Sequence, residues 1–244
     1  MNEFLREIAN IFYKEHQADI SDITFVFPSR RAGLFFQKYL SEIINQTIFS
    51  PTCITINDLL SKESSLRQAD SKLDLLFRLY FIYKKHIKTD ETFDMFFNWG
   101  EMLISDFDDI DKYLVNAEQL FKNIEDLKEL EDDFSYLTDN QREVMHSFWK
   151  NFIGNQKNKG EIGNNFTEVW TKLYNIYTDF KSDLLANNIA YEGLILRNIV
   201  DRIKEGEELF KTYKQIVFIG FNALTPGEKY FFKYLKNKEK ADFY

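Results

Sequence analysis

The chain has 244 residues, 44% of them hydrophobic, and a formal net charge of −8. This composition is typical of a globular protein, and the negative charge argues against a protein whose whole surface binds nucleic acid. Because Cys53 is the only cysteine, a disulfide framework is excluded. No apolar run is long enough to span a bilayer, and the N-terminus lacks a signal-peptide pattern, so we expect a cytoplasmic protein that does not contact membranes.

The first part of the chain, residues 1–65, alternates helical and strand patterns. Residues 23–27 (ITFVF) are continuously apolar, which is typical of a parallel strand buried on both faces. Pro28 ends this strand, and Ser29 is in a favourable position to cap the next helix. That helix is expected to direct five side chains inward: Leu34, Phe35, Tyr39, Leu40 and Ile43. A second strand, 52–56, and a short helix follow.

The middle of the chain, residues 66–209, contains no convincing strand pattern. Residues 73–83 (LDLLFRLYFIY) are apolar nearly all round, which predicts a deeply buried helix. Residues 93–107 and 164–186 also have helical spacing of apolar residues. We therefore predict a large all-helical subdomain, inserted between two parts of an α/β domain.

The strand pattern returns at residues 215–219 (QIVFI), so the α/β domain is expected to comprise residues 1–65 and 210–244. Thr225 to Glu228 form a capping-box pattern with proline at the first helical position. Residues 241–244 resemble the start of another strand. The pattern indicates that the chain is one piece of a longer protein.

The sequence carries no recognisable catalytic or cofactor motif. The string G-x-x-x-x-G-K-[ST], which would cradle nucleotide phosphates, is absent. Four aspartates in 106–111 lack the glycine and distal glutamate of a calcium loop, so a solvated helix end is the favoured interpretation. The three histidines are scattered at positions 16, 86 and 146, and Trp99 and Trp149 are interpreted as core aromatics. We expect no metal, no cofactor and no catalytic residue in this chain.

The turn after the first strand is the strongest candidate site. Arg30 and Arg31 fall in the first turn of a helix, where cations oppose the helix dipole and gain no stability from it. Arginines at such a position often face an anion. One alternative is a solvated corner, and another is that the arginines are structural and pair with Asp22 or Glu42.

Four stretches in this order resemble the N-terminal region of AddB-like helicase/PD-(D/E)XK nuclease proteins of the Bacteroidetes type. They are ITFVFPSRRAGLFFQKYL, CITINDLL, FFNWGEMLISDFDDIDKYLVNAEQLF and IVFIGFNALTPGEKYFFKYL. The resemblance implies a degenerate P-loop-NTPase, superfamily-one helicase-like parallel sheet (1A-like) with a large helical insertion (1B-like). It also implies an AddA-like helicase subunit as partner and a parent protein that is a DNA repair exonuclease.

The positions at which this sequence differs from the resembling family determine which function we expect. The phosphate-binding strand and helix are missing, and Ile219 stands where the family has its magnesium-binding aspartate. The resemblance therefore implies an ATPase-inactive fragment that acts as a scaffold and binds the backbone of a DNA strand. Its expected phosphate-binding residues are Ser29, Arg30, Arg31, Thr55 and Asn57. The alternative is a scaffold that docks a helicase partner without touching DNA.

Overall fold

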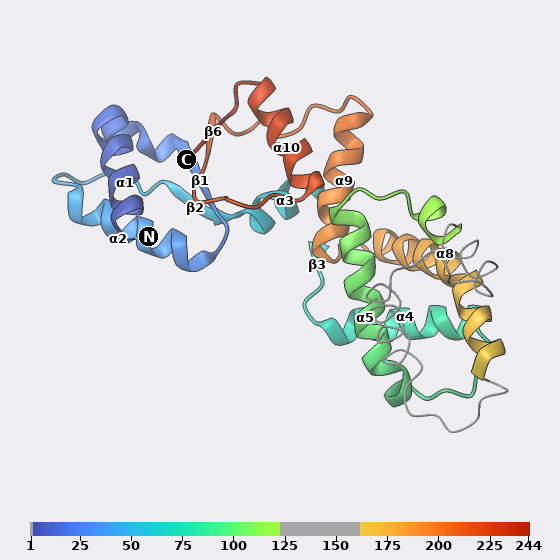
Figure 1. Ribbon diagram of the computed structural model, residues 1–244. Coiled ribbons are helices and arrows are strands. Elements are labelled where there is room, and N and C mark those ends of the chain that lie inside the picture. Colours follow the sequence, from blue (N-terminus) through green and yellow to red (C-terminus); the bar gives the residue numbers. More distant parts are fainter. Residues whose placement is uncertain (1, 123–161) are drawn as a thin grey trace, which may run out of the picture. The chain divides into compact units, whose positions relative to one another are not determined.

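The computed structural model describes residues 2–122 and 162–244 (Figure 1), and these form two compact units. Unit 1 comprises residues 1–68, 111–114 and 191–244, and contains a four-stranded sheet. Unit 2 comprises residues 69–110 and 115–190, and its described elements are mainly helices. The chain is therefore an α/β protein with a small parallel sheet.

The sheet of unit 1 has the strand order β2-β1-β5-β6, and all neighbouring strands are parallel. The strands are β1 (Ile23–Phe27), β2 (Thr52–Thr55), β5 (Gln215–Phe218) and β6 (Ala241–Phe243). The three strands expected near 23–27, 52–56 and 215–219 are thus confirmed, and so is the start of a strand after residue 240. All five residues of β1 are buried, as expected for a central parallel strand.

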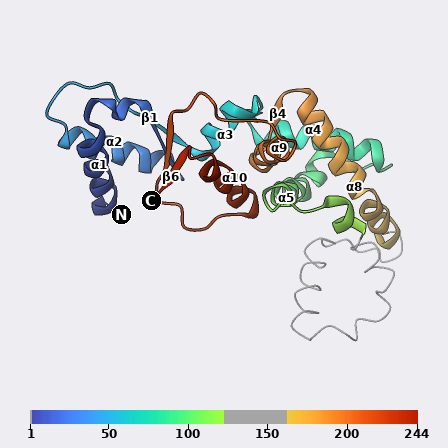
Figure 2. The ribbon, with the colours of Figure 1, turned by 90° about the horizontal axis from the view of Figure 1, so that it is seen from above.

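Helices cover both faces of this sheet. On one face, Phe25 and Phe27 of β1 pack with α1 (Asn2–His16) and α2 (Arg30–Ile43) in a continuous core. On the other face, Phe218 contacts the rings of Phe231 and Phe232 from α10 (Pro226–Asn237). Figure 2 shows α10 beside α9 (Glu192–Lys204), and the backbone of α10 approaches α9 closely at Gly227. The remaining elements of unit 1 are η1 (Gln17–Asp22), α3 (Ile56–Ser64) and β3 (Arg67–Gln68).

The expected domain boundaries differ from these units at residues 66–68, at residues 111–114 and, over the longest stretch, at residues 191–209. Residues 66–209 were expected to form the helical insertion, but α9 belongs to unit 1. The reason is its packing: seven residues of α9 are buried, and the helix contacts α3 and α10. A sequence pattern shows that α9 is amphipathic, but does not show which neighbour covers its apolar face.

Unit 2 contains α4 (Lys72–His86), α5 (Phe93–Lys112) up to residue 110, α8 (Ile162–Ala186) and the two-residue strand β4 (Ile189–Ala190). Helices α4 and α8 pack together, and Arg78 of α4 forms an ion pair with Asp183 of α8 at 2.9 Å. Trp99 is partly buried and packs edge-on against Tyr83 and Phe96, so it lies at the margin of the core of this unit. Trp149 and His146 lie outside the described residues.

Two expectations for residues 66–209 require correction. First, β3 and β4 are strands where none was expected; at two residues each, they are too short to produce an alternating pattern. Second, α4 is not deeply buried on all sides, because Leu73, Phe77 and Phe81 are 48%, 45% and 69% exposed. Its buried face is formed by Leu75, Leu76, Leu79 and Tyr83.

Candidate functional site

Two neighbouring parallel strands, β1 and β2, each lead directly into a helix at the same edge of the sheet. After β1, the Oγ atom of Ser29 accepts a hydrogen bond from the backbone N–H of Ala32 at 3.4 Å, which caps α2. After β2, Thr55 caps α3 by accepting a bond from the backbone N–H of Asp58 at 3.2 Å. The positive ends of two helix dipoles therefore lie close to one another.

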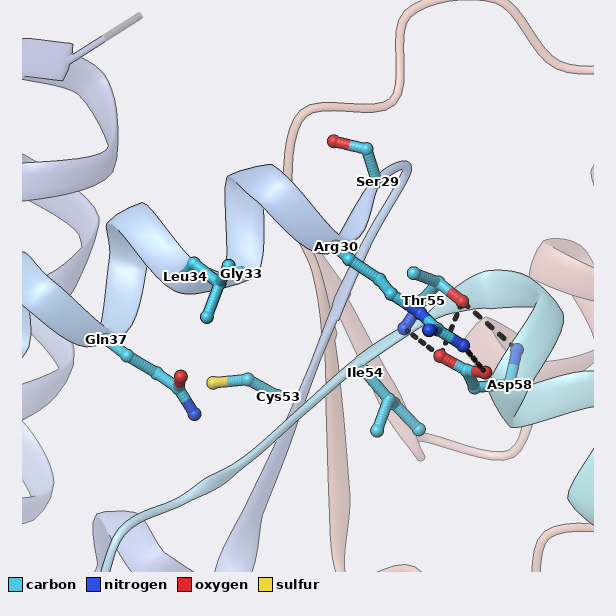
Figure 3. A pocket seen from close by; sticks show the side chains of 9 residues that line it. All are labelled: Ser29, Arg30, Gly33, Leu34, Gln37, Cys53, Ile54, Thr55 and Asp58. Carbon is cyan, nitrogen blue, oxygen red and sulfur yellow. Dashed lines mark hydrogen bonds and ion pairs between the residues drawn. The ribbon is translucent and has the colours of Figure 1, made fainter.

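A cavity of about 250 Å³ lies between these two turns. Figure 3 shows its lining, which comes from α2, β2 and the first turn of α3. One end is polar and includes Arg30, Thr55 and Asp58, whereas Gln37 and Cys53 lie together at the other end. The complete lining is Ser29, Arg30, Gly33, Leu34, Gln37, Cys53, Ile54, Thr55 and Asp58.

The polar end of the cavity is organised around the carboxylate of Asp58. Its Oδ2 accepts hydrogen bonds from the backbone N–H of Thr55 at 3.2 Å and from the hydroxyl of Thr55 at 2.7 Å. Its Oδ1 accepts from Nη2 of Arg30 at 3.4 Å, although 83% of the Arg30 side chain is exposed. Burial acts to raise the pKa of Asp58, but the bonds from Thr55 and the charge of Arg30 outweigh it and lower that pKa.

The opposite end of the cavity contains a protected thiol. Burial raises the pKa of Cys53 to about 12, despite a hydrogen bond with Gln37 that acts in the other direction. The thiol is therefore protonated at neutral pH and is not a nucleophile there. This end of the cavity presents a neutral surface.

The structure brings three of the five expected site residues together: Ser29, Arg30 and Thr55 all line the cavity. Arg31 does not line it, and its guanidinium lies 5.7 Å from the centre of the Phe35 ring. Asn57 also lies apart, because its side-chain amide donates to Oε1 of Glu192 at 2.8 Å.

The alternative partners considered for the arginines are occupied elsewhere. Asp22 pairs with Lys214 at 2.7 Å, and Glu42 pairs with Arg6. The residue that does pair with Arg30, Asp58, was missed by the sequence analysis. The sequence does contain a pattern that indicates a role for Asp58, because Thr55 to Asp58 form the same capping-box pattern as Thr225 to Glu228.

The other side chains considered for catalysis or metal binding contact neighbouring side chains of the fold. Asp111 is completely buried and accepts from the Tyr191 hydroxyl at 2.6 Å, so the interpretation of residues 106–111 as a solvated helix end is wrong for this residue. His86 lies 2.8 Å from a carboxylate oxygen of Asp179, and the His16 ring stacks on Phe12. Among the described residues, no group of three or more histidine, cysteine or acidic side chains could hold a metal ion.

Comparison with protein-family models and with curated protein sequences finds no match to this chain. In the described part of the chain, no helix has both the length and the apolar character needed to cross a membrane.

Proposed function

We propose that this chain is the N-terminal, ATPase-inactive helicase-like part of a cytoplasmic AddB-like DNA repair nuclease. In this proposal it binds the backbone of a single DNA strand at the turns that lead into α2 and α3. The observation that supports the proposal is the meeting of two capped helix N-termini with an exposed arginine between them. Backbone amides at helix N-termini and guanidinium groups are suitable partners for a phosphate. In open α/β sheets, ligands gather at the carboxyl ends of the strands, where this cavity lies.

Removal of the two arginines tests this function. We expect Arg30→Ala with Arg31→Ala to weaken binding of fluorescein-labelled oligothymidylate, measured by fluorescence anisotropy at several salt concentrations. Each lost phosphate contact should reduce the slope of log K against log salt by about 0.7 for single strands. Because Arg30 lines the cavity and Arg31 lies over Phe35, Arg30→Ala alone should account for most of the effect.

A matched variant controls for net charge. Lys88→Ala removes one exposed cation from unit 2, which contains none of the cavity residues; it is the counterpart of Arg30→Ala and should leave the affinity unchanged. The arginine variants should melt as the wild type does, within about 0.5 kcal/mol in unfolding free energy, since exposed charges contribute little. If the folded double variant bound DNA as tightly as the wild type, the turn would have no role in DNA binding.

A second function, docking of a protein partner such as an AddA-like helicase subunit without contact to DNA, is favoured by one separate observation. The exposed side chains of Leu73, Phe77 and Phe81 form an apolar stripe along α4, and Phe77 stacks on Phe93 with ring centres 4.2 Å apart. Large exposed apolar surfaces often mark interaction sites. Two results together would favour this second function. The chain would not bind DNA at low salt, and it would pull down a purified helicase subunit in the wild type but not in the Phe81→Ser variant.

A further inference from the structure

Asp58 has one carboxylate oxygen more than its capping role requires. The second capping box of the chain, at Thr225 and Glu228, shows what the cap alone uses. There a single oxygen, Oε2 of Glu228, accepts from both the backbone N–H of Thr225 at 2.8 Å and its hydroxyl at 2.9 Å. In the box at Thr55, Oδ2 of Asp58 makes the same two contacts, so Oδ1 is left for Arg30.

The position of this oxygen bears directly on the binding of an anion. Asp58 places a negative charge in the first turn of α3, where it interacts with the same helix dipole that would favour a phosphate. It also occupies one of the donor groups of Arg30. A phosphate that approaches Arg30 must therefore displace a carboxylate and come close to its charge.

We propose that Asp58 is a built-in competitor for the strand phosphate: it holds Arg30 in the free protein, releases it when DNA binds, and so keeps the affinity for DNA low. This inference rests on the proposed DNA-binding function. The contact is suited to release, because the distance is 3.4 Å and 83% of the Arg30 side chain is exposed. Ion pairs with such exposure are weak and readily exchanged.

Two substitutions separate the charge of Asp58 from its capping role. Glutamate and glutamine are both regular third residues of a capping box, so Asp58→Glu and Asp58→Gln preserve the cap and differ in charge. We expect Asp58→Gln to bind oligothymidylate about three- to tenfold more tightly than the wild type, and Asp58→Glu to bind about as the wild type does. Glu228→Gln is the matched control, because it removes the same charge from the other capping box.

A double-mutant cycle tests whether Asp58 acts through Arg30. If it does, the gain from Asp58→Gln should be largely lost in an Arg30→Ala background. An equal gain in that background, or no gain in the wild-type background while melting curves show a folded protein, would overturn the inference. An equal gain from Glu228→Gln would overturn it as well, since net charge alone would then explain the effect. If the wild type and every variant fail to bind DNA, the proposed function itself is wrong, and this inference is wrong with it.

Discussion

At the scale of single residues, the first two turns of α2 show how a helix chooses its buried face. Leu34 was expected to point inward but is 66% exposed, whereas Phe36 is completely buried. The ring of Phe36 lies 4.6 Å from the ring of Phe25 and 5.4 Å from that of Phe27. The apolar residues of this helix permit more than one face, and contact with the two strand aromatics decides between them.

Truncation of these two side chains should have very different effects. Phe36→Ala leaves a cavity in the core, and we expect the free energy of unfolding to fall by about 3–5 kcal/mol. Leu34→Ala should change it by about 0.5 kcal/mol or less, since most of the side chain is already exposed to water. Urea denaturation followed by circular dichroism measures both. Comparable losses from the two variants would show that α2 is rotated relative to the structure.

The thiol of Cys53 provides a prediction about pH. Its pKa is raised from 9.0 to about 12 in the folded protein, so folding favours the protonated form. Stability is therefore unaffected while the thiol is protonated in both states, and falls as pH rises above about 9, where only the unfolded chain loses the proton. Alkylation by iodoacetamide at pH 8 should be much slower in native protein than in urea. Cys53→Ala should reduce the loss of stability between pH 8 and 10.

At the scale of elements, the sheet could be predicted because its signals are local. Continuous apolar runs identified β1 and β5, and the turn residues identified the helix starts at Ser29 and Thr225. The face that each helix buries, as in α4 and α9, depends on neighbours distant in the chain. The same limit applies to the site: Ser29, Arg30 and Thr55 follow from strand ends, but the pairing of Asn57 with Glu192 spans 135 positions.

The packing of α10 depends on a close backbone approach at Gly227. A Cβ atom at this position would lie 2.8 Å from a methyl carbon of Leu196 and 2.8 Å from the carbonyl oxygen of Lys112. Because a backbone oxygen cannot move aside easily, Gly227→Ala should destabilise unit 1 by about 1–3 kcal/mol. Lys229→Ala, at an exposed position on the same helix, is the control and should have little effect on the urea midpoint.

At the scale of the whole molecule, an α/β sheet with helices on both faces is an architecture that supports many functions, so the site must carry the argument. In this chain the carboxyl edge of the sheet has an exposed arginine, Arg30, and two helix caps. The charge of Arg30 is neutralised by the carboxylate of Asp58. Such a site is suited to weak, reversible contact with a phosphodiester.

The same edge leads us to expect that the protein does not bind ATP. The turn between β1 and α2 consists of Pro28 and Ser29, which is too short to wrap around a chain of phosphates. Ile219, which stands where the resembling family has its magnesium-binding aspartate, is 1% exposed and belongs to the core beneath α1 and α2. The apolar side chain of Ile219 could not coordinate a metal ion.

Thermal melting with and without millimolar Mg-ATP tests this expectation. A ligand that binds the native state stabilises it by RT ln(1 + [L]/Kd), so even a modest affinity would raise the melting temperature. We expect the melting temperature to stay the same, whereas oligothymidylate at low salt should raise it in the wild type and less in Arg30→Ala. A rise with Mg-ATP that disappears when magnesium is chelated would show that the chain retains a nucleotide site, which would then have to lie away from the β1–α2 turn.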